Sequence, residues 1–234
     1  MQIFKVRSLE TAPLLQVNLN DEISVFEDSV IGKAKRYELP WKPIPTTRFK
    51  KPGDRKVRKY CDLTYILANV NVPIFSGSAK TSLEPILGDT VQWLPIEFQE
   101  QEYWIVNILK TVSLDLQSSQ IISYPDGGLA TIEQFAFEEL SVRDKWLFKV
   151  PQRTFWVLCT ERFRDHVLQN ELTGFYFEVV WDSRYKPFPD ALYNDTDVVG
   201  RPEIYGPNGV RPIPKQWRKQ YWPPEWFEIE AAKD

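Results

Sequence analysis

The sequence has few of the side chains that bind transition metals or carry out nucleophilic catalysis. It contains one histidine, His166, and two cysteines, Cys61 and Cys159, which lie far apart. A structural zinc site needs four Cys or His ligands at short spacings, and the sequence offers no such set. Secreted disulfide scaffolds use more cysteines than this. We therefore expect two reduced thiols, no metal, no cofactor and a cytoplasmic location.

Long apolar runs are also missing, and glycine is scarce. No uninterrupted run approaches the roughly 20 residues that a membrane-spanning helix needs. The first residues, Met1–Arg7, alternate between apolar and polar, which predicts a strand rather than a secretion signal. Ten glycines against eighteen prolines favour short extended segments over long helices.

The charges are divided between two segments of opposite sign. Residues 33–59 hold eleven Lys or Arg and two acids, a net charge of +9, whereas residues 84–139 hold ten acids and only Lys110, a net charge of −9. The whole chain carries only −3. A strongly acidic surface speeds the capture of a basic partner and sharpens specificity for it. The acidic candidates for contacting a partner are Glu97, Glu100, Glu102 and Asp115.

The order of the segments predicts an α+β fold, mainly an antiparallel sheet with a few short helices. Residues 1–62 form an N-terminal strand and a basic, proline-punctuated segment, residues 63–181 form the compact core, and residues 182–234 form a Trp- and Pro-rich tail packed on that core. Within the core, short apolar runs rich in aromatic and β-branched residues predict strands. These runs are 63–67, 91–98, 103–109, 120–124, 129–137, 146–150 and 155–159.

Two helices stand out in the core. Ser76 or Ser78 is a plausible N-cap for the first helix, and Pro85 should bend or end it. Its apolar face comprises Ala79, Leu83, Ile86 and Leu87.

The second helix follows Thr160, a further candidate N-cap, and buries Phe163 and Val167 on one face. Asn170 can end it. We expect the strand at residues 174–181 that follows to be interior.

Three sequence features leave other functions open. Gly77–Ser82 resembles the end of a phosphate-binding loop, but Ala79 stands where the loop needs glycine before its lysine, so a capped helix start is favoured. A small hydrolase or transferase would use either a Cys159–His166 pair or the carboxylates near residues 97–102. A nucleic-acid-binding module would use the basic residues at 48–60, although most of the remaining surface is acidic.

A set of segments in the core resembles a bacterial immunity-protein family, the eleventh in the usual numbering of such families. The segments that carry the resemblance are 72–76 leading into the 80–87 helix, 94–98, 103–109, Leu114-Asp115 with Ser118 or Ser119, 146–149, 161–170 and 172–177.

The resemblance covers about residues 60–181 and implies a non-enzymatic protein of a polymorphic toxin system, which binds and neutralises a cognate toxin domain. It supplies no catalytic residues. The partner is then a protein domain; no membrane partner is expected, and nucleic acid is the less favoured alternative. The basic segment and the tail lie outside the resemblance.

Overall fold

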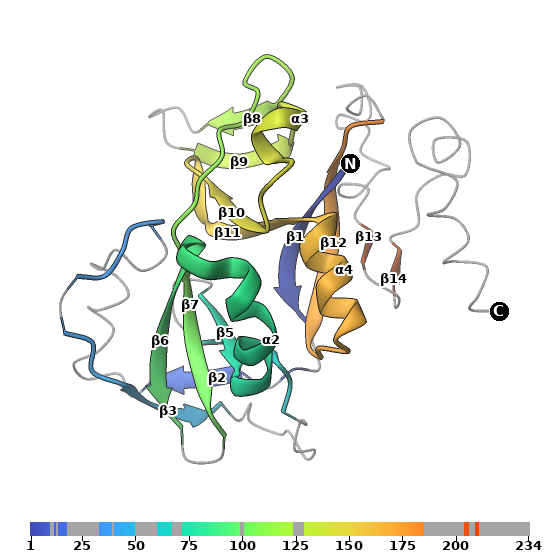
Figure 1. The fold of residues 1–234 in the computed structure, drawn as a ribbon. Coiled ribbons are helices and arrows are strands. Elements are labelled where there is room, and N and C mark those ends of the chain that lie inside the picture. Colours follow the sequence, from blue (N-terminus) through green and yellow to red (C-terminus); the bar gives the residue numbers. More distant parts are fainter. Residues whose placement is uncertain are drawn as a thin grey trace. The chain divides into compact units, whose positions relative to one another are not determined.

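A computed structural model describes residues 1–9, 12, 14–17, 33–38, 40–49, 60–66, 72–98, 101–123, 129–184, 204–205 and 209–210 (Figure 1). Three sequence predictions lie outside these residues: a partner contact at Glu100, the basic stretch 50–59, and nearly all of the packing of the tail. Within the described part of the chain, no helix is long and apolar enough to cross a membrane.

The described chain forms two compact units. One unit, here called the barrel unit, comprises Val6–Val112 and Lys145–Tyr176. The other, here called the hairpin unit, comprises Met1–Lys5, Ser113–Asp144 and Phe177–Asp234. As expected, the fold is α+β, mostly strands with a few short helices.

Six short strands of the barrel unit close into a barrel in the order β2-β3-β6-β7-β5-β4. Neighbours pair antiparallel, except that β3 runs parallel to β6 and β4 runs parallel to β2, and these two pairs complete the ring. The strands are β2 (Leu14–Val17), β3 (Ile44–Arg48), β4 (Leu63–Ile66), β5 (Pro73–Ser76), β6 (Val91–Glu97) and β7 (Tyr103–Ile108).

Apolar side chains fill the inside of the barrel. Because side chains alternate along a strand, each strand contributes every second residue to this interior. The buried set is Leu15, Val17, Ile44, Ile66, Val72, Ile74, Leu94, Ile96, Tyr103 and Ile105. The intervening residues of β5 and β7 face the opposite way, which makes these strands available for packing against a helix.

Helix α2 (Gly77–Leu87) follows β5 directly and packs against β5 and β7. The predicted cap at Ser76 is confirmed, since its hydroxyl accepts a hydrogen bond from the Ala79 N–H at 3.1 Å. Of the predicted face, Ala79, Leu83 and Leu87 are buried. Pro85 lies within the last turn, and the helix gives way after Leu87 to a 3₁₀ turn, η1 (Gly88–Thr90).

A four-stranded sheet has the order β10-β11-β1-β12, with strands β10 (Leu147–Val150), β11 (Arg153–Thr160), β1 (Gln2–Ser8) and β12 (Phe175–Asp182). The prediction that the strand at residues 174–181 is interior is wrong for the described strands, among which β12 has β1 as its single neighbour and lies at the edge of this sheet. Most of its side chains are only partly buried. A strand at the edge of a sheet leaves aromatic side chains such as those at 175–177 partly exposed.

Helix α4 (Glu161–Gln169) follows β11 and buries Phe163 and Val167, as predicted. Thr160 precedes the helix but does not cap it with its side chain, so that part of the prediction is wrong. Its hydroxyl instead donates to the Lys145 carbonyl at 2.6 Å. Local sequence could not reveal this competing acceptor.

The hairpin unit contains the antiparallel pair β8 (Gln120–Ser123) and β9 (Leu129–Gln134), followed by the one-turn helix α3 (Glu139–Val142). The remaining strands, β13 (Ile204–Tyr205) and β14 (Gly209–Val210), form a short antiparallel pair.

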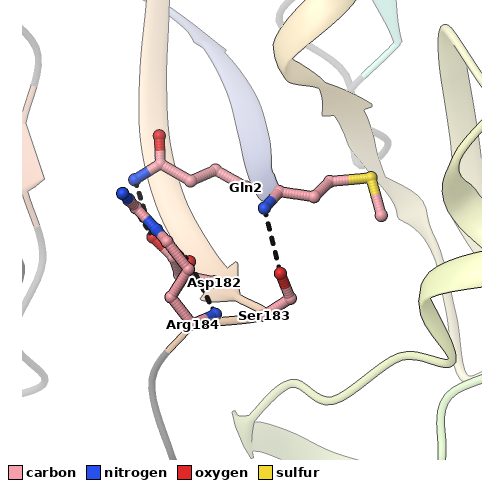
Figure 2. A network of polar contacts seen from close by, with 5 residues as sticks. Gln2, Asp182, Ser183 and Arg184 are labelled. Carbon is pink, nitrogen blue, oxygen red and sulfur yellow. Dashed lines mark hydrogen bonds and ion pairs between the residues drawn. The ribbon is translucent and has the colours of Figure 1, made fainter.

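Figure 2 shows the hydrogen bonds of the hairpin unit that connect the beginning of β1 to the end of β12. Gln2 Nε2 donates to Asp182 Oδ2 at 3.0 Å, and the guanidinium of Arg184 donates to the same oxygen at 2.7 Å. The amino group of Met1 donates to Ser183 Oγ at 2.9 Å. Burial alone would raise the pKa of Asp182, but these hydrogen bonds, led by those from Arg184, lower it.

Candidate partner-binding surface

Glu97 is the last residue of β6, and Glu102 directly precedes β7. Both residues are exposed, and their backbone carbonyls are used in the fold: that of Glu97 accepts from the Thr46 hydroxyl and that of Glu102 from the Gly77 N–H. A Cβ at Gly77 would lie 2.9 Å from Glu102 Oε2, so this carboxylate lies beside the first residue of α2. These carboxylates are therefore accessible to a partner of the barrel unit.

Asp115 is in the hairpin unit, where its carboxylate stabilises a turn. Oδ1 accepts from the Gln117 N–H at 3.0 Å, and the Asp115 N–H donates to the Ala136 carbonyl at 2.9 Å. Hydrogen bonds from the Ser118 side chain and then from the Gln117 N–H lower the pKa of this carboxyl group. Asp115 thus has a conformational role, and the acidic candidates are divided between the two units.

Part of the basic segment forms a strap along the barrel, here defined as residues 33–43 without Leu39. The Gln92 side-chain amide pairs with the Tyr37 backbone, donating to its carbonyl and accepting from its N–H, both at 2.9 Å. Trp41 donates from its indole N–H to the Pro95 carbonyl at 2.7 Å. These contacts fix the strap on β6. Its exposed basic residues are Lys33, Lys35, Arg36 and Lys42.

A polar cluster centred on Asp62 joins three segments of the barrel unit. Its carboxylate accepts from the hydroxyls of Ser76 and Ser78, both at 2.6 Å, and from the N–H and hydroxyl of Thr173, both at 2.8 Å. Burial would raise the pKa of Asp62, but the hydrogen bonds from Ser76, Ser78 and Thr173 together lower it. The cluster is a structural tie between β4, α2 and the loop before β12.

No disulfide joins the two cysteines, and the Cys159–His166 pair is not assembled. Cys159 is fully buried, and burial raises the pKa of its thiol well above the ordinary value. His166 Nε2 lies 3.2 Å from both Ser82 Oγ and the Ser82 carbonyl oxygen, which connects α4 to α2. Among the described residues, no hydrogen bond joins the imidazole to the thiol. This pair is therefore not arranged for nucleophilic catalysis.

Three large apolar side chains in the described ranges are exposed, and sequence reasoning missed all of them. Leu116 and Leu140, in the hairpin unit, are 64% and 76% exposed, and Leu168, in α4, is 61% exposed. Leu116 and Leu140 are each adjacent to an acidic residue in the sequence, and this was the one sequence signal of their exposure. An apolar patch rimmed by polar residues is a feature of binding sites, whereas single exposed apolar side chains are common.

Possible metal ligands are dispersed in the part of the chain that the structure covers. No group of three or more His, Cys, Asp or Glu side chains is placed there to hold a metal ion.

Comparison with known protein families identifies the family of this chain. The model of the family described as "Immunity protein family (Imm11)" matches residues 15–182. No curated protein matches the chain. The matched range is longer than the resemblance noted in the sequence, and it includes the barrel strands, the strap and both longer helices.

Proposed function

We infer that this chain, which belongs to the Immunity protein family (Imm11), is a non-enzymatic immunity protein that binds one cognate bacterial toxin domain and neutralises it. The observation that carries the proposal is the family match over residues 15–182. That range covers most of the described structure, so the membership applies to the folded core rather than to an isolated motif. Neutralisation would take place in the cytoplasm, where the toxin would otherwise act.

The side-chain chemistry supports a binding role. Cys159 is buried, and the ring of His166 contacts Ser82. Glu97 and Glu102, the described members of the alternative carboxylate site, have exposed side chains, whereas catalytic carboxylates are usually at least partly desolvated. The surface, in contrast, combines acidic residues with exposed leucines.

The proposal is tested by co-expression. The toxic domain encoded beside this chain is expressed in bacteria alone and together with the chain, and growth is recorded. We expect growth to be restored only when the chain is present. A Gly174→Ala variant serves as a control that protection requires the folded chain. It should be destabilised, because a Cβ at this position would collide with the Leu63 carbonyl oxygen. Equally poor growth with and without the chain would refute the proposal.

The exposed basic residues of the strap support a second candidate, a nucleic-acid-binding module. Lys33, Lys35, Arg36 and Lys42 are exposed on one short segment, and basic side chains bind phosphates in a salt-dependent manner. A mobility-shift assay with generic DNA and RNA at low and moderate salt distinguishes this candidate. A mobility shift that weakens with salt would support this candidate, whereas no shift at low salt would exclude it and leave the immunity function as the single candidate.

A further inference from the structure

We propose that Leu116 and Leu140 form the apolar centre of the surface that binds the toxin domain. Both leucines are exposed in the hairpin unit among acidic side chains, so the facing toxin surface is apolar with a basic rim. The two residues are called the leucine pair below. This inference rests on the proposed function and specifies which part of the chain performs it.

The exposure of the leucine pair is selective rather than a sign of loose packing. Leu114, two residues before Leu116, is 5% exposed, and Val142, two residues after Leu140, is fully buried. Phe135 and Phe137 are also buried, and Phe137 packs against Trp181 with ring centroids 5.7 Å apart. These neighbouring apolar side chains are therefore packed, and the leucine pair is left exposed beside them.

Hydrogen bonds hold Leu116 in a defined turn. Asp115, the preceding residue, accepts from Gln117 through its side chain and from Ser118 and Ser119 through its carbonyl. The Ser119 hydroxyl bonds to both the carbonyl and the N–H of Ala136, at 3.3 and 3.0 Å. A side chain presented by a preorganised turn loses less conformational entropy on binding than one on a free loop.

The same hydrogen bonds bring the leucine pair into one region. The Asp115 N–H donates to the Ala136 carbonyl at 2.9 Å, and Leu140 is four residues beyond Ala136. Four residues span at most roughly 14 Å even when fully extended. A standard interface buries about 800 Å² on each partner. Both leucines therefore fit beneath one protein partner.

The charges around the leucine pair specify a basic partner. Residues 113–144 contain six acids and one base, Arg143, a net charge of −5. Among them Glu138, Glu139 and Asp144 are exposed, and the first two directly precede Leu140. A complementary basic rim would accelerate association and reject acidic surfaces. Removing an exposed leucine from water is worth about tenfold or more in affinity, so the pair can supply a large share of the binding energy.

The test compares matched leucine substitutions in the full chain. Leu116→Ser and Leu140→Ser are made singly and together, with Leu168→Ser as a control, because Leu168 is similarly exposed but lies on α4 of the barrel unit. Binding to the purified toxic domain encoded beside the chain is measured by calorimetry. We expect each leucine-pair variant to weaken binding at least tenfold, and Leu168→Ser to change it less than twofold. Thermal unfolding should be unchanged in all of them, because the altered side chains are exposed.

The outcomes separate this inference from the proposed function. If the unaltered chain binds and Leu116→Ser/Leu140→Ser binds equally well, the surface is wrong while the immunity function stands. If the unaltered chain does not bind, the immunity function fails and the inference fails with it.

A second measurement uses charge. Glu138→Gln/Glu139→Gln should slow association severalfold and flatten its salt dependence, whereas Glu84→Gln on α2 should not. Equal association rates for both variants would contradict a basic partner.

Discussion

The sharpest stability prediction concerns Gly174, in the loop between α4 and β12. Its φ is +83°, a region that other residues adopt only with strain, and a Cβ there would lie 2.5 Å from the Leu63 carbonyl oxygen and 2.6 Å from Cys61 Cβ. Its own carbonyl accepts from the Leu9 N–H at 2.9 Å. Three separate segments therefore meet at this glycine, and little space remains for a methyl group.

The magnitude follows from two contributions. Placing alanine at a sparsely populated φ costs about 1–3 kcal/mol. Forcing a methyl group into a packed site costs about another 1–3 kcal/mol. Gly174→Ala should therefore lower the free energy of unfolding by roughly 2–6 kcal/mol, a large part of the roughly 5–15 kcal/mol that holds a typical domain folded.

Gly88 provides the matched control. Its φ is also positive, at +48°, but nothing lies within 4 Å of the position that a Cβ would take there. Gly88→Ala should therefore show only the backbone contribution, about 1–3 kcal/mol. Urea unfolding followed by tryptophan fluorescence measures both variants, since Trp93 and Trp104 lie in the barrel. Equal midpoints for the two variants would refute the argument that the close approach at Gly174 makes glycine necessary.

Three further results are expected. The pKa of Asp62 is lowered in the folded state, so the stability that its carboxylate contributes is present above the ordinary pKa and is lost as the pH falls through the folded pKa. The difference in unfolding free energy between the unaltered chain and Asp62→Asn should therefore shrink from about pH 5 to about pH 2. A difference that stays constant over that range would contradict the hydrogen-bonded carboxylate. Ser76→Ala removes the cap of α2 and a donor to Asp62, so it should cost about 1–2 kcal/mol in urea unfolding, and no loss would show that the cap is dispensable. Burial raises the thiol pKa of both cysteines, but only Cys159 is fully buried. A thiol reagent near neutral pH should therefore label Cys61 slowly and Cys159 only after unfolding. Rapid labelling of two thiols in the native protein would disprove this.

Local signals in the sequence predicted the individual elements well. The strands β6, β7, β10 and β11 coincide closely with the apolar runs, and Ser76 correctly marked the start of α2. These predictions work because alternation and capping are properties of a few neighbouring residues.

Properties set by distant residues were not predictable in the same way. Closure of the barrel depends on the parallel pairs β2–β4 and β3–β6, whose members are far apart in sequence. Thr160 is of a residue type and at a position that predict an N-cap, but its hydroxyl donates a hydrogen bond to the Lys145 carbonyl instead. The edge position of β12 likewise depends on which strand lies beside it.

The candidate site shows the same limit. Glu97 and Glu102 are exposed, as acidic residues usually are, but the sequence could not reveal that Asp115 stabilises a turn. A hydropathy pattern treats Leu114 and Leu116 alike, whereas the structure buries one and exposes the other. Exposure of a leucine is decided by which core positions are already filled, and that information is three-dimensional.

Neutralisation by binding rather than by catalysis can be measured by titrating the purified chain into a fixed amount of the candidate toxin domain from a neighbouring gene and recording the remaining toxic activity. A binding protein removes activity in proportion to the amount added, until every toxin molecule is occupied. We expect this linear loss, with an end point set by a fixed ratio of the two chains. Complete inactivation by a small fraction of that amount, or no inactivation at any ratio, would contradict it.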